Sequence, residues 1–104
     1  MESKTAVYES SLELLKSLIK DVFKGEHVTV VLFGSRARGD NLETSDMDIG
    51  ILPGKDMNKD KITLFREKIE NSNVPYKVDL IDLSQTSKEF TDKVLKEGIL
   101  LWKN

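Results

Sequence analysis

The chain has 104 residues and a mass of 11.8 kDa, which favours one domain over residues 1–104. Its 16 Lys and Arg residues and 18 Asp and Glu residues give a net charge of −2, which counts against strong non-specific binding of nucleic acid. The absence of cysteine excludes disulfides, Cys-ligated zinc and thiol nucleophiles. No apolar run approaches the roughly 20 residues that span a bilayer, and residues 1–4 do not begin a signal peptide. We therefore expect a cytoplasmic protein without a membrane partner.

The first half of the chain predicts one helix and two strands. Over residues 5–24, apolar side chains recur every three or four positions opposite charged ones, which is typical of an amphipathic helix that ends at Gly25. Residues 27–33 read HVTVVLF, a β-branched and aromatic run that predicts a buried strand. A polar segment with glycine follows over residues 34–44, and residues 47–52 predict a second apolar strand that Pro53 and Gly54 end.

The second half predicts two helices around one strand. Residues 60–70 carry Ile62, Phe65 and Ile69 at helical spacing, residues 77–83 form the strand KVDLIDL, and residues 87–97 form a helix before Gly98. Residues 99–102 read ILLW, which fits either core packing or a docking surface. The order α-β-loop-β-α-β-α places the chain in the α/β (α+β) class.

Two aspartates stand at the head of the second strand, in the sequence Ser45-Asp46-Met47-Asp48. Side chains alternate along a strand, so Asp46 and Asp48 project from the same face with Cα atoms about 6.5 Å apart. Carboxylates in this arrangement hold divalent ions about 3.5 to 4 Å apart, a spacing that clamps the attacking and leaving oxygens of a phosphoryl-type displacement. The pair therefore predicts a magnesium site with two ions, because Mg²⁺ prefers oxygen ligands together with substrate phosphates.

The pair Gly34-Ser35 lies where the first strand ends. Glycine lets the backbone approach a phosphate, free backbone N–H groups point at it, and the Ser35 hydroxyl is a further donor. An anion site beside a cation site is what a nucleoside triphosphate with its metal requires.

A third carboxylate would complete the metal shell and help to deprotonate an incoming hydroxyl. The strand 77–83 offers Asp79 and Asp82. Asp82 shares a face with Val78 and Leu80, which suits the side that helices cover, so Asp79 points toward the open face. We choose Asp79 as the third ligand and interpret Asp82 as a residue at the end of the strand.

The stretch GSRARG, followed by SDMDIGIL and then VDLIDL, resembles the minimal nucleotidyltransferase (MNT) family of the DNA polymerase β-like superfamily. The likeness covers nearly the whole chain and includes the form GSxARG. It implies a mixed sheet with helices on one face, and transfer of AMP from ATP, with Mg²⁺, to a hydroxyl. It also implies that Gly34 and Ser35 contact the triphosphate, that Asp46 and Asp48 bind metal, and that Asp79 binds metal and activates the nucleophile.

Chains of this size are similar to the antitoxins of HEPN/MNT toxin–antitoxin pairs. In those pairs the MNT protein adenylylates a tyrosine of the HEPN ribonuclease and silences it. The resemblance therefore implies a HEPN-domain toxin as the partner in a hetero-oligomer.

Several alternatives remain open. Three roles are open for Arg36 and Arg38: binding of the triphosphate, contact with a partner protein, or ion pairs with Asp40 and Glu43. Of the two arginines, we assign Arg36 to the nucleotide. A second interpretation of the chain is a binding module that neutralises its partner by occlusion alone, and a third is a nucleotidyltransferase for a small molecule or an RNA end.

Overall fold

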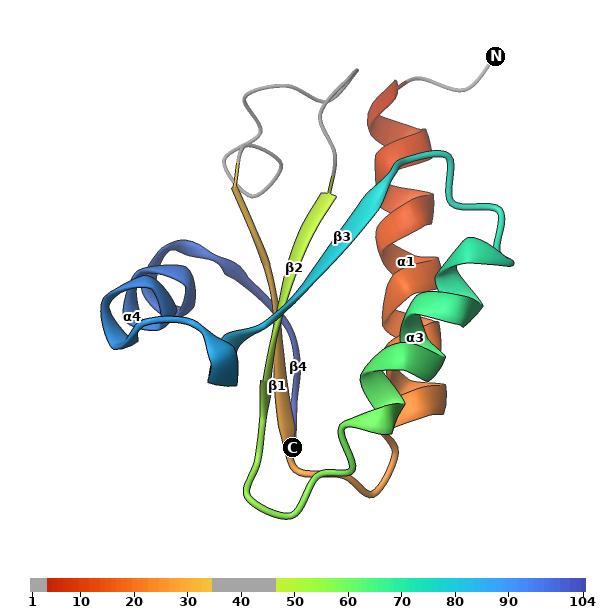
Figure 1. Ribbon diagram of the computed structural model, residues 1–104. Coiled ribbons are helices and arrows are strands. Elements are labelled where there is room, and N and C mark those ends of the chain that lie inside the picture. The colour runs from red at the N-terminus through yellow and green to blue at the C-terminus, as the bar shows by residue number, and fades with distance from the viewer. Residues whose placement is uncertain (1–3, 35–46) are drawn as a thin grey trace.

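The structure, a computed structural model, describes residues 4–34 and 47–104. Its elements are α1 (Lys4–Phe23), β1 (Val28–Phe33), β2 (Met47–Pro53), α3 (Asp60–Glu70), β3 (Val78–Asp82), the 3₁₀ helix η1 (Leu83–Gln85), α4 (Lys88–Glu97) and β4 (Ile99–Lys103). The strands form one sheet in the order β3-β2-β1-β4, in which β1 is antiparallel to β2 and β4 while β2 is parallel to β3 (Figure 1). The predicted α/β class with a mixed sheet is confirmed.

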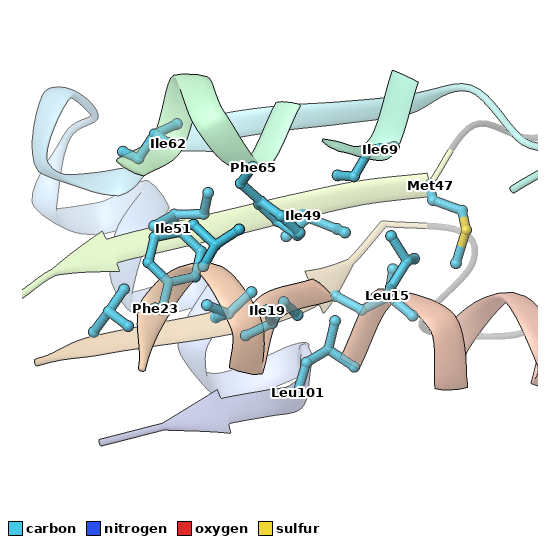
Figure 2. Close-up of a cluster of buried hydrophobic side chains, with 14 of the residues drawn as sticks. Leu15, Ile19, Phe23, Met47, Ile49, Ile51, Ile62, Phe65, Ile69 and Leu101 are labelled. Carbon is cyan, nitrogen blue, oxygen red and sulfur yellow. The ribbon is translucent and has the colours of Figure 1, made fainter. Parts of the chain in front are cut away.

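The main hydrophobic core lies between the sheet and the helices α1 and α3, which cover the same face (Figure 1). Figure 2 shows side chains from α1, α3 and β2 meeting in this layer. Phe23 of α1 and Phe65 of α3 are fully buried and meet edge to face, with ring centroids 5.5 Å apart. In the described part of the chain, no helix is long and apolar enough to cross a membrane.

The helix α4 lies on the opposite face of the sheet from α1 and α3 (Figure 1), so the expectation that all helices cover one face was wrong. Val94 of α4 packs there against Val31 of β1 and Leu83 of η1 in a second, smaller core. The physical reason lies in β1, whose consecutive residues Val30, Val31 and Leu32 are all buried and need cover on both faces.

The apolar residues 99–102 form most of an edge strand, β4, that the sequence did not predict as a strand. A register shift in its pairing leaves Leu101 without a partner, between the pairs Val31–Leu100 and Val30–Trp102. Leu101 is therefore buried in the main core and Trp102 packs against it, while Leu100 is exposed. Core packing is confirmed for Leu101 and Trp102, and a docking surface at the exposed Leu100 stays a prediction.

Candidate active site

Two of the three predicted carboxylates lie side by side in the sheet. Asp48 of β2 pairs in register with Asp79 of β3, and paired residues of neighbouring strands project from the same face. The strands run about 4.8 Å apart, which brings the two carboxylates within reach of a shared ligand. Both residues are half-buried. The flanking Val78 and Leu80 pack on the main core, so Asp79 lies on the opposite face, as the alternation predicted. That face was expected to be open, but α4 covers part of it (Figure 1).

Gly34 follows β1 and lies directly against the Asp48 carboxylate. Its φ of +81° belongs to the left-handed region, which side chains disfavour. A Cβ atom at this position would stand 2.7 Å from Oδ2 of Asp48. Only glycine lets the backbone approach the carboxylate so closely. The predicted phosphate turn at Gly34 therefore lies in contact with the predicted metal ligand Asp48.

Replacing Gly34 by alanine is expected to cost about 1–2 kcal/mol of folding free energy from backbone strain and to lower activity at least about tenfold by displacing the Asp48 carboxylate. Gly25→Ala is the matched control, because Gly25 has a φ of +82° with nothing within 4 Å of the added Cβ. Urea denaturation measures the first effect, and initial rates of the nucleotide transfer that the resemblance implies measure the second. Equal activity losses in both variants would contradict the contact with Asp48.

Three of the predicted site residues, Ser35, Arg36 and Asp46, lie outside the described residues. The residues on either side of that segment are described. Met47 begins β2 and its backbone N–H donates to the carbonyl of Lys77 at 2.9 Å, just before β3. Gly34 and Met47 therefore stand at the same end of the sheet as Asp48 and Asp79.

The described donor set fits a hard divalent cation. Asp48 and Asp79 offer only carboxylate oxygens, which suit Mg²⁺ rather than softer metals. Among residues 4–34 and 47–104, no group of three potential ligands is close enough to hold a metal ion. A third protein ligand would have to come from outside those residues, which is where Asp46 lies.

Asp82 is the last residue of β3, and its side chain caps the 3₁₀ helix η1 that follows. Its carboxylate accepts hydrogen bonds from the backbone N–H and the hydroxyl of Ser84, at 2.9 and 2.6 Å, and lies 3.4 Å from the Lys59 ammonium. Partial burial raises the pKa of Asp82, but the bonds from Ser84 and the charge of Lys59 outweigh it, so the pKa lies below its usual value of 3.8. The interpretation of Asp82 as a strand-end residue is confirmed.

A lowered pKa in the folded state means that the ionised Asp82 stabilises the fold above pH 3.8, and that this stabilisation disappears as the pH falls through the lowered pKa. Asp82→Asn keeps the shape of the cap but removes the charge. We expect it to lose up to about 1 kcal/mol of unfolding free energy at pH 7 and almost nothing at pH 2. Urea denaturation at both pH values tests this, and an equal loss at both would contradict it.

Sequence reasoning missed an aromatic pair beside the carboxylates. Phe33 of β1 pairs in register with Asp48, and its ring meets that of Phe90 of α4 edge to face, with centroids 5.9 Å apart. Phe90 stood at helical spacing with Val94, a pattern typical of core residues, yet its side chain is 37% exposed. Val94 of the same helix is buried, so the helical spacing alone did not show which of the two side chains lies in the core.

Comparison with known families places the chain in a class of enzymes. The family described as Polymerase beta, Nucleotidyltransferase matches residues 16–104. The chain belongs to this nucleotidyltransferase family, and the match confirms the resemblance that the GSxARG and Asp-x-Asp motifs predicted.

Individual relatives are similar over most of their length. The Haemophilus influenzae protein named "Probable protein adenylyltransferase MntA" is 25% identical over 95 residues, which cover 91% of this chain and 82% of the relative. A chain of a toxin–antitoxin crystal structure with AMP-PNP is 25% identical with a TM-score of 0.68, over 89% of this chain and 73% of that one. A structure of the tri-AMPylated Shewanella oneidensis HEPN toxin in complex with MNT antitoxin contains a chain that is 22% identical, with a TM-score of 0.63, over 92% and 72%. The last likeness shows the fold alone.

Proposed function

We propose that the protein transfers AMP from ATP to a hydroxyl group of a partner protein, and that the partner is a HEPN-domain toxin. The observation that carries this proposal is the row formed by Gly34, Asp48 and Asp79 at one end of the sheet, in a chain that belongs to a nucleotidyltransferase family. Two relatives support the finer assignment. One is named a protein adenylyltransferase, and the other comes from a toxin–antitoxin structure with AMP-PNP, an analogue of ATP.

Each residue of the site has a role in this proposal. The backbone at Gly34, with Ser35 and Arg36, holds the triphosphate. Asp46 and Asp48 bind the metal, and Asp79 binds metal and accepts the proton of the incoming hydroxyl. Mg²⁺, when bound, neutralises the negative charge that builds up on the transferred phosphoryl group.

The direct test uses the purified protein with its HEPN-domain partner, Mg²⁺ and ATP labelled at the α-phosphate. We expect label to appear in the partner protein and to require the metal, since EDTA should abolish it. ATP labelled at the γ-phosphate is the control and should leave the partner unlabelled, because the pyrophosphate carries that label away. Absence of transfer from the α-labelled nucleotide would overturn the proposal.

A second candidate function, neutralisation by occlusion without chemistry, is favoured by one observation. Exposed apolar side chains gather on α4 and β4, where Leu95, Ile99 and Leu100 are 39%, 43% and 55% exposed. Under occlusion, Asp48→Asn would still suppress the toxin, whereas Leu100→Ser would not. Under adenylyl transfer, Asp48→Asn releases the toxin. Growth of cells that express both proteins distinguishes the two functions.

A further inference from the structure

The strand β3 is the outermost strand at one side of the sheet, and within the described part of the chain it pairs with β2 alone. This pairing continues in register over all five residues of β3, whereas a register shift interrupts the pairing of β4 at the opposite edge. All five residues of β3 stay partly exposed, although Val78, Leu80 and Ile81 are apolar. A regular, exposed edge of this kind is a template for a further strand.

The hydrogen-bond pattern shows which backbone groups of β3 face outward. The N–H of Met47 donates to the carbonyl of Lys77, and Met47 pairs in register with Val78. In a parallel ladder this pattern repeats at every second residue, so β2 is bonded to the odd-numbered positions from 77 to 81. The N–H and C=O groups of Val78 and Leu80 therefore point away from β2, and none of the residues that the structure describes bonds to them.

A groove of about 400 Å³ adjoins this edge on the face of the sheet that α1 and α3 cover. It is lined by apolar and aromatic side chains of β3, of α3 and of the loop between them, which are Val78, Leu80, Ile69, Val74 and Tyr76. Pockets that bind ligands start near 300 Å³, so the groove has room for a side chain of a bound peptide.

Hydrogen bonds and a ring contact hold the loop wall of this groove in place. The Ser72 hydroxyl donates to the carbonyl of Ile69 at 2.6 Å and accepts from the backbone N–H of Val74 at 3.3 Å. The ring of Tyr76 packs edge to face on Tyr8 of α1, with centroids 6.4 Å apart. Because the wall is tied to α3 and to α1, little ordering remains to be done when a segment binds.

We propose that an extended segment of the partner protein pairs with the open edge of β3 and becomes a fifth strand of the sheet. In this binding mode main-chain hydrogen bonds supply affinity, and pockets for alternate side chains supply specificity. Side chains of the segment opposite Val78 and Leu80 enter the groove, whereas those opposite Asp79 lie on the face of the candidate active site. The identity of the partner, a HEPN-domain toxin, rests on the proposed function, and the edge adds how that partner docks.

The side chains around the edge define the chemistry of the segment. On the walls of the groove, Arg66 and Lys77 are accompanied by Glu70 and Asp79, so no excess positive charge is available for the phosphate backbone of a nucleic acid. The apolar lining favours apolar side chains at every second position of the segment instead. On the opposite face Asp48 and Asp79 lie side by side, so the segment should carry no acidic residue there.

Charge also counts against a second copy of this chain as the occupant. Pairing of two β3 strands would bring Asp79 and Asp82 of both copies into one pair of strands, where their carboxylates repel. Charged side chains on an edge strand are a common means by which proteins prevent such self-pairing. We therefore assign the edge to a different chain.

Hydrogen exchange at single amides of the wild-type protein tests the proposal. In the free protein the N–H groups of Val78 and Leu80 should exchange fast, and those of Asp79 and Ile81, which β2 binds, should exchange slowly. Addition of the HEPN-domain partner is expected to slow exchange at Val78 and Leu80 at least about tenfold, with Asp79 and Ile81 as internal controls. Unchanged exchange at Val78 and Leu80 in the complex overturns the proposal. Protection that instead grows with the concentration of this protein alone also overturns it, because a second copy would then occupy the edge.

Val78→Pro removes one outward N–H and keeps every bond to β2, since the N–H of Val78 faces away from that strand. It is expected to weaken binding of the HEPN-domain partner at least about tenfold relative to Val78→Ala, because a carbonyl of the partner loses its donor. Val78→Ala is the matched control, which shortens the same side chain but keeps the N–H. The KM for ATP should be the same in both variants. Equal affinities of the two variants for the partner overturn pairing at this edge.

Transfer of label from α-labelled ATP, measured on the same wild-type complex, separates this proposal from the proposed function. Label transfer without protection of Val78 and Leu80 overturns docking at the edge alone. Protection of these two amides without label transfer overturns adenylyl transfer alone.

Discussion

Asp48→Asn is expected to lower the rate of AMP transfer by about 10²–10³-fold while leaving the free energy of unfolding within about 1 kcal/mol of the wild type. The carboxylate would bind the metal that stabilises the developing charge, a contribution of several kcal/mol, and each 1.36 kcal/mol is tenfold in rate. The free energy of unfolding should change little because Asp48 and Asp79 are like charges on neighbouring strands, and removing one of them relieves repulsion. Initial rates of label transfer and urea denaturation measure the two quantities.

The control for this variant is Asp56→Asn, which makes the same chemical change at an exposed turn residue after β2. It is expected to keep wild-type rates. Near-wild-type transfer by Asp48→Asn would remove this carboxylate from the reaction, and a large loss of stability would mean that its main role is structural.

Phe65→Ala is expected to lower the free energy of unfolding by about 3–5 kcal/mol. Phe65 is fully buried and meets Phe23 edge to face, so truncation leaves a cavity between α1 and α3 and removes the ring contact. Domains of this size are stable by only about 5–15 kcal/mol, so the variant should be partly unfolded at physiological temperature. The midpoint of urea denaturation measures the change.

The neighbouring Leu64 provides the control, because it lies on the same helix with a side chain that is 39% exposed. Leu64→Ala is expected to cost less than about 1 kcal/mol. Similar losses in the two variants would indicate that α3 does not pack on the sheet through the face that carries Phe65.

Local patterns in the sequence predicted most elements of the fold, and the errors have physical causes. The helices follow the expected period of 3.6, and β1 and β2 stand out as short apolar runs that a glycine or a proline ends. The strand β4 was not predicted because residues 99–102 are all apolar and carry no alternation that would mark a strand with one exposed face. The side of the sheet that α4 covers is a tertiary property, although the apolar run over residues 30–33 of β1 already indicated that both faces need cover.

The candidate site was predictable only where it depends on local sequence patterns. Alternation along 77–83 was enough to separate Asp79 from Asp82, since it depends only on the period of a strand. That Asp79 pairs in register with Asp48 depends on the parallel pairing of β2 with β3, which residues far apart in the chain determine.

The intact mass of the HEPN-domain partner, purified after co-expression with this protein, tests the central claim most directly. Co-expression with the wild type should add one or more adenylyl groups to the mass of the partner, and co-expression with Asp48→Asn should add none. An unmodified partner in both samples, in cells where the wild type suppresses the toxin, would contradict adenylyl transfer and favour neutralisation by occlusion.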